Sequence, residues 1–99
     1  MNFRNPEAQH AIARLRVALQ DWEDPNDAET TEKLKSAITA LDTMFSPTSN
    51  HVCHNAIDAI DRYACKSIQY GGLAFRLKEL CAAFAINEEN IAIQDRESD

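Results

Sequence analysis

The most regular feature of this sequence is a stripe of apolar residues near its start, in which spacings of four and three residues alternate. The stripe consists of Ala8, Ile12, Leu15, Leu19 and Trp22. Residues at these spacings lie on one face of an α-helix, because the helix repeats about every 3.6 residues. Asn5 can cap this helix, and Pro6 suits its first position, where the missing N–H of proline costs nothing. The pattern predicts an amphipathic helix whose apolar face packs against other helices.

Proline and glycine divide the rest of the chain into three further helical segments. Pro47 ends the second segment, because a residue that precedes proline avoids the helical conformation, and the third runs to Gly71. Residues that favour helix starts precede these segments: Asp24 or Asp27 for the second, and Ser49 or Asn50 for the third. Asn87 can cap a short fifth turn, after which residues 95–99 are expected to fray.

The other apolar residues also recur at helical spacing, and no stretch alternates apolar and polar residues as a strand does. The second and fourth segments carry the stripes Leu34, Ile38, Leu41, Phe45 and Leu73, Leu77, Leu80, Phe84. A chain of 99 residues, 44% apolar and 26% charged, suits one domain with a modest core. We predict an all-α fold, a small antiparallel helical bundle of four main helices plus a short C-terminal turn, as a single domain over residues 1–99.

His51, Cys53 and His54 lie within four residues of one another, a cluster that raises the possibility of a metal site. On a helix, however, Cys53 lies on the apolar side, whereas both histidines lie on the other side. A zinc site needs about four converging ligands, and one helix face offers only a pair such as His51 with His54 or His54 with Asp58. No second pair of histidines or cysteines at a metal-binding spacing occurs. We predict a buried Cys53, a solvated His and Asp face with an Asp58–Arg62 pair, and no metal or other cofactor.

No pattern of residues favours catalysis. A phosphate-binding loop requires glycines, and the chain has glycine only at Gly71 and Gly72. Cys65 and His54 would lie roughly 16 Å apart along one helix, too far to act as nucleophile and base. We predict that the protein is not an enzyme.

The charge distribution favours a protein partner. The formal net charge of −6 opposes direct contact with nucleic acid or an anionic membrane. A block of acids surrounds the single tryptophan and precedes Lys33: Asp21, Glu23, Asp24, Asp27, Glu29 and Glu32. Such blocks are usually solvated or lie near a helix start. Because tryptophan is common at interface hot spots, we expect a docking patch for a basic partner. Its residues are Asp21, Trp22, Glu23, Asp24 and Asp27, and closure of the core is the alternative role of Trp22.

The fourth segment carries a second apolar line, Phe75, Ala82 and Ile86, beside its main stripe. A four-helix bundle has no evident internal use for this line, so we expect a homodimer interface there, with a place in the core as the alternative. The first helix shows a fainter second line at Ala13 and Val17.

Together these patterns predict a small acidic regulatory or inhibitory protein that acts by contact on a larger, basic partner, such as a transcription regulator or a nucleic-acid-handling machine. We expect it in the cytoplasm, because no signal-peptide core or membrane-length apolar run occurs and the three cysteines fit reduced thiols. One alternative is a self-associating structural or adaptor domain. The other is a metal-binding or thiol-reactive protein that uses His54, Asp58 and Cys65 or Cys81.

If no metal supports the fold, prolonged treatment of the purified protein with a chelator should leave helicity and melting temperature unchanged. A structural zinc ion contributes strongly to folding, so its removal would cause a large loss of helix. Circular dichroism before and after chelation measures the difference, and a large loss would contradict the prediction.

Overall fold

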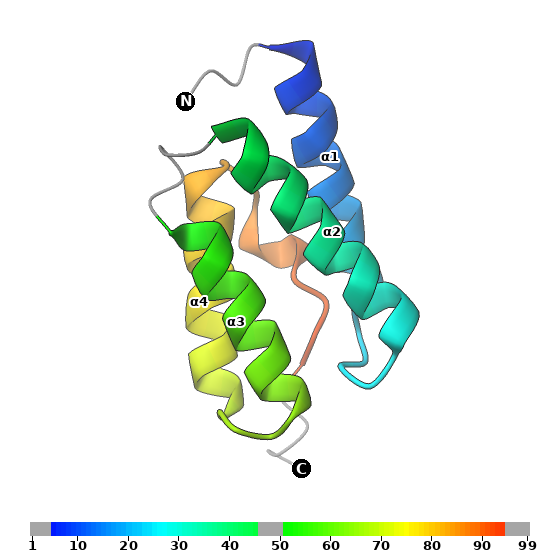
Figure 1. Ribbon diagram of the computed structural model, residues 1–99, viewed down its shortest axis with the longest axis vertical. Coiled ribbons are helices and arrows are strands. Elements are labelled where there is room, and N and C mark those ends of the chain that lie inside the picture. The colour runs from blue at the N-terminus through cyan, green and yellow to red at the C-terminus, as the bar shows by residue number, and fades with distance from the viewer. Residues whose placement is uncertain (1–4, 46–50, 95–99) are drawn as a thin grey trace.

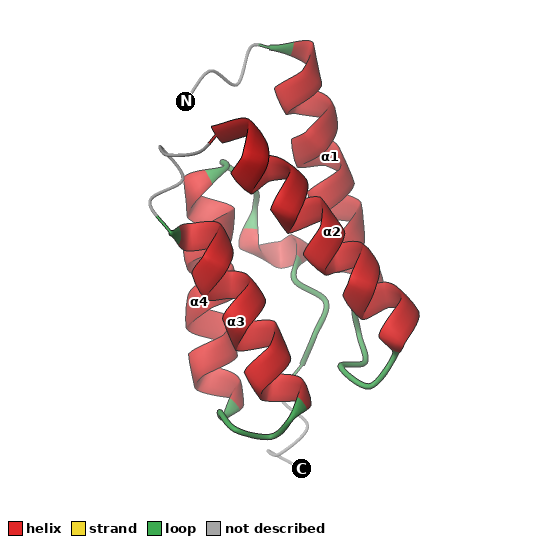
Figure 2. Cartoon of the chain, viewed as in Figure 1, coloured by secondary structure: helices red, strands yellow, loops and turns green. Residues whose placement is uncertain are grey.

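The computed structural model describes residues 5–45 and 51–94 of the 99-residue chain. Within these ranges four α-helices follow one another and a short 3₁₀ helix, η1, comes last (Figure 1). Their bounds are α1 Pro6–Asp21, α2 Ala28–Phe45, α3 Val52–Ala64, α4 Tyr70–Ala83 and η1 Glu88–Asn90. The described residues contain no strand (Figure 2), which confirms the all-α prediction. The proposed caps Ser49 and Asn50 and the tail 95–99 lie outside the described residues.

Successive helices run in opposite directions and form two hairpins (Figure 1). α1 packs on α2, α3 packs on α4, and the two hairpins meet where α2 packs on α3. α1 and α4 do not pack directly on each other; η1 contacts both of them instead. The molecule is therefore an antiparallel helical bundle with one side that four helices alone leave open.

The segment after η1 helps to close this open side. The amide N–H of Ala92 donates to the carbonyl oxygen of Leu19 at the end of α1 (3.3 Å). The hydroxyl of Tyr70, at the start of α4, donates to the carbonyl oxygen of Ile93 (3.1 Å). The side chain of Ile93 is buried, so this segment contributes to the core as well as to the hydrogen bonds.

The apolar stripes that define the helices face one continuous core. Its largest fully buried side chains come from all four helices and the segments that follow α1, α4 and η1: Leu15, Leu19, Trp22, Leu34, Ile38, Leu41, Ile60, Leu73, Leu77, Leu80, Phe84 and Ile93. Burial of each such side chain contributes about 1.5–3 kcal/mol relative to exposure. Packing of the stripes is therefore what holds the two hairpins together.

Side-chain caps mark the helix starts that the sequence indicates. The Asn5 carboxamide oxygen accepts the N–H of Glu7 (2.9 Å), and Pro6 occupies the first helical position, as predicted. Of the two starts considered for α2, Asp27 is the one used, because its carboxylate accepts the N–H of Glu29 (3.1 Å). The Asn87 side chain accepts the N–H of Glu89 (2.9 Å) and so caps η1, as predicted.

The predicted end of the third helix at Gly71 is wrong. α3 ends at Ala64, and Lys66 then adopts a left-handed conformation with φ of 62°. The N–H of Ser67 donates to the carbonyl of Arg62 (2.8 Å) and that of Lys66 to the carbonyl of Tyr63 (3.0 Å), the two bonds of a Schellman motif. Gly71 belongs to the first turn of α4 and has no positive φ. A lysine thus occupies the helix-ending position for which glycine is the usual signal.

α4 ends in the same way, with an alanine in the left-handed position. Ala85 has a φ of 57°, and its N–H donates to the carbonyl of Ala82 (3.5 Å). The N–H of Ile86 donates to the carbonyl of Cys81 (2.8 Å). This turn directs the buried side chain of Ile86 back to the core.

Ala85→Gly should stabilise the protein by about 0.5–1 kcal/mol, because relief of the left-handed alanine exceeds the extra chain entropy of glycine. Urea unfolding measures the difference. Ala82→Gly is the matched control: Ala82 is exposed and helical, so this change should destabilise by about 1 kcal/mol. Destabilisation by both changes would contradict the assignment of this turn.

Candidate interaction surface

The His-Cys-His cluster does not converge on one point. Cys53 is fully buried in the core, whereas His54 is exposed and its Nε2 lies 3.2 Å from a carboxylate oxygen of Asp42 on α2. His51 precedes α3 with a φ of 66°, and its ring centroid lies 6.4 Å from that of His54. Within residues 5–45 and 51–94 no three His, Cys, Asp or Glu side chains form a metal-binding group. The sequence correctly places Cys53 and His54 on different sides of the helix.

The three thiols differ in their surroundings. Burial raises the pKa of Cys53 to about 11, with a contribution from the charge of Asp42. Burial likewise raises the pKa of Cys81 to about 11, with a contribution from Glu88. Both are therefore protonated near neutral pH and poor nucleophiles, because the thiolate is the reactive form. Cys65 is the exposed thiol, so a thiol-reactive role would have to use it.

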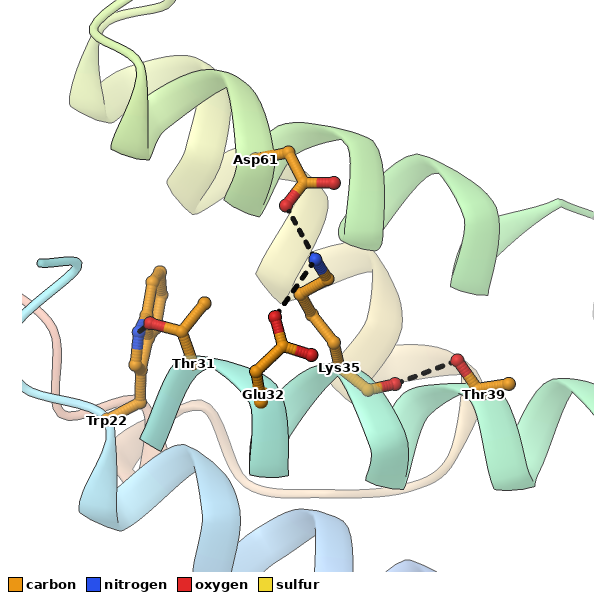
Figure 3. Close-up of polar contacts among 6 residues, drawn as sticks. All are labelled: Trp22, Thr31, Glu32, Lys35, Thr39 and Asp61. Carbon is orange, nitrogen blue, oxygen red and sulfur yellow. Dashed lines mark hydrogen bonds and ion pairs between the residues drawn. The ribbon is translucent and has the colours of Figure 1, made fainter. Parts of the chain in front are cut away.

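Trp22 is a core residue, which corrects its assignment to the docking patch. Its side chain is fully buried, and its indole N–H donates to the hydroxyl of Thr31 on α2 (2.9 Å; Figure 3). Trp22 also ends α1, since its backbone N–H donates to the carbonyl of Ala18 (3.1 Å). It continues the apolar stripe of α1 and closes the core, as the alternative reading of the sequence proposed.

The acids next to Trp22 remain at the surface, where α1 and α2 are joined. We call Asp21, Glu23, Asp24 and Asp27 the acidic tip. Asp21, Glu23 and Asp27 are exposed and Asp24 is half-buried. Asp24 also accepts the N–H of Asn26 (2.9 Å), and Asp27 caps α2, so these two carboxylates both shape the connection and give it negative charge.

The acids that follow the tip are balanced by lysines. Glu29 lies 3.2 Å from Lys33 one turn along α2. The ammonium of Lys35 lies 3.6 Å from Glu32 and 2.9 Å from Asp61 on α3 (Figure 3). The hydrogen bond with Asp61 is the main cause of the raised pKa of Lys35, which burial partly opposes. Lys35 therefore joins the two hairpins, and the acidic tip lies in a stretch of the sequence that has no lysine or arginine between Arg16 and Lys33.

The predicted dimer face of α4 is smaller than expected, because Ile86 is buried in the core. Phe75 is 57% exposed and Ala82 is exposed, so these two residues keep the proposed placement at the surface. Between them along the helix lie the exposed Lys78 and the Arg76–Glu79 ion pair (3.2 Å). The second apolar line of α4 is thus reduced to one large side chain and a distant methyl group.

A groove of about 500 Å³ lies between α1 and α2 on the outside of their hairpin. Its lining combines the small side chains of Ala13, Ala18 and Ala37 with larger polar and charged ones, from His10, Arg14, Asp21, Thr30 and Lys33. Val17 also lines the groove and is 53% exposed. A second hollow of about 420 Å³ continues along α1 towards Pro6 and shares His10 and Arg14 with the first. The faint second line of Ala13 and Val17 was the only sign of this groove in the sequence.

Comparison of the chain with family models, with curated proteins and with solved structures gives no match. Among the described residues, no helix is both long and apolar enough to cross a bilayer. The acidic tip and the groove between α1 and α2 are the surface features of the described residues that bear on function.

Thr31→Val should destabilise the protein by about 1–3 kcal/mol, because it leaves the buried indole N–H of Trp22 without its acceptor. Thr39→Val on the same helix is the matched control. The Thr39 hydroxyl is exposed and donates to the carbonyl of Lys35 (2.8 Å), so its loss should change stability by no more than about 0.5 kcal/mol. Chemical unfolding followed by tryptophan fluorescence compares the two variants, and equal small effects would contradict a structural role of the Trp22–Thr31 bond.

Proposed function

We propose that this chain is a small regulatory or inhibitory protein that acts in the cytoplasm by contact with a larger, basic partner. A transcription regulator or a nucleic-acid-handling machine has the required positive surface. The observation that carries the proposal is the acidic tip, where four carboxylates gather at one end of a hairpin and no lysine or arginine occurs between Arg16 and Lys33. Such a concentration of one charge attracts an oppositely charged surface and repels phosphate.

The local structure of the tip supports a contact role. Backbone N–H groups fix the carboxylates of Asp24 and Asp27, and the buried Trp22 anchors the connection between them and α1. Charges held in place in the free protein lose little conformational freedom when a partner binds, which reduces the cost of association. The tip is therefore suited to rapid, charge-guided binding rather than to a large apolar interface.

A variant that removes three of the four charges of the tip without changing its shape tests this proposal. Glu23→Gln, Asp24→Asn and Asp27→Asn remove three charges, while each introduced asparagine keeps an oxygen that can accept the same backbone N–H. The matched control is Glu7→Gln, Glu88→Gln and Glu89→Gln, which removes three charges from exposed positions elsewhere. Immobilised wild type and control should capture the same basic protein from an extract of the source cells.

The tip variant should retain that protein about tenfold less well at low salt, and its association should depend less on salt, because exposed charges act mainly on the rate of encounter. Biolayer interferometry with the captured protein measures both quantities. Equal association rates for the tip variant and the wild type would contradict the proposal.

A further inference from the structure

The outer face of α1 combines an exposed apolar side chain with two charges of opposite sign. Val17 is 53% exposed, and Arg14 and Asp21 lie about one turn before and after it on the wall of the groove. Both charged residues are exposed, and neither side chain makes an ion pair or hydrogen bond with any described residue. We call Arg14, Val17, Ala18 and Asp21 the α1 face.

The order of these residues makes the α1 face complementary to itself. If two α1 helices lie antiparallel about a two-fold axis between Val17 and Ala18, Arg14 of each copy lies opposite Asp21 of the other. Two ion pairs then form at symmetry-related positions, as an isologous interface requires. We propose that the α1 face binds a second copy of this chain in this antiparallel arrangement.

The shape of the groove agrees with this occupant. Val17 projects beside a hollow whose lining includes Ala13, Ala18 and Ala37, and at these positions the small side chains allow the backbone of another helix to approach closely. Each copy thus presents a projecting side chain next to a hollow. Two-fold pairing places the Val17 side chain of one copy at the groove of the other and removes both from water.

The charges also select the direction of the pairing. A parallel arrangement in register would place Arg14 against Arg14 and Asp21 against Asp21, which opposes association. The antiparallel arrangement places the two acidic tips on opposite sides of the two-fold axis. At a helical rise of about 1.5 Å per residue, Asp21 of one copy and Asp21 of the other would be roughly 10 Å apart along the helices, further apart than each is from the Arg14 that it faces.

The α1 face shares Asp21 with the acidic tip, but Glu23, Asp24 and Asp27 take no part in it, so the variants that test the two proposals change different residues. It also replaces Phe75 and Ala82 of α4 as the site of self-association. Substitutions on the α1 face and at Phe75 of α4 are expected to have different effects on dimerisation.

The test is a charge exchange measured by sedimentation equilibrium at low salt. The wild type should show a reversible dimer, and Arg14→Glu alone or Asp21→Arg alone should weaken dimerisation more than tenfold, because each places like charges at both ion-pair positions. An equimolar mixture of the two variants should dimerise again. In the mixed dimer the introduced glutamate faces the introduced arginine, and the native Asp21 faces the native Arg14.

Two controls accompany the exchange. Arg16→Glu reverses an exposed charge on α1 that does not line the groove, and Phe75→Ser removes the large exposed side chain of α4. Both should leave the dimer unchanged, and circular dichroism verifies that every variant is folded. If a variant of the exchange pair loses helix, Val17→Glu takes its place as the variant expected to be a folded monomer.

Three outcomes would overturn the proposal. A wild type that stays monomeric up to roughly 1 mM has no such dimer. A dimer that survives both single charge reversals, or that Phe75→Ser disrupts, uses another face. Folded monomeric variants whose mixture stays monomeric do not pair in the antiparallel arrangement.

Discussion

Burial of Trp22 is the constraint on which much of this structure depends. Its side chain completes the apolar stripe of α1, and its indole N–H bonds to Thr31, so the end of α1 is fastened to the start of α2. The chain must reverse direction immediately afterwards, and Asp24 and Asp27 supply the side-chain acceptors that this reversal needs. The acids beside the tryptophan are consequently turned towards solvent. The proposed docking tip is thus a product of core packing, even though Trp22 itself has no place on the surface.

The helices and their starts follow from the sequence because local physics decides them. Spacings of three and four place Leu15, Leu19 and Trp22 on one face, and Asn5, Asp27 and Asn87 lie where an N-terminal cap is needed. The end of α3 could not be predicted in this way. Lys66 adopts a left-handed conformation that lysine does not signal, and this strain is sustained by the two Schellman hydrogen bonds and the packing around them. Gly71 wrongly indicated the end of the third helix, because neither Gly71 nor Gly72 adopts the positive φ for which glycine is usually needed.

The candidate surface was harder to predict from the sequence than the fold, since it depends on which apolar side chains remain exposed after the core is packed. Four helices were expected to complete the core, which left Ile86 without an internal partner. The bundle instead has an open side between α1 and α4, where η1 and the buried Ile93 contribute, and Ile86 turns inwards just before them. The groove beside Val17 arises in the same way, because alanines on both α1 and α2 leave a hollow there. Such a hollow depends on how two helices pack, so the faint line of Ala13 and Val17 on α1 alone could not locate it.

The charges of the two proposed surfaces act over different distances. At the acidic tip, several like charges lie close together in a fixed connection, and their field extends over about one Debye length to guide a basic surface. On the α1 face, opposite charges nearly cancel at a distance, so they act only at contact, where they determine the register of a small apolar patch.

Both surfaces contain Asp21, whose charge would be paired in the dimer. The tip would then act through Glu23, Asp24 and Asp27, with one tip on each side of the two-fold axis. In that arrangement self-association would present two docking sites related by the two-fold axis, and a partner with two basic sites could bind both and gain affinity without any new contact.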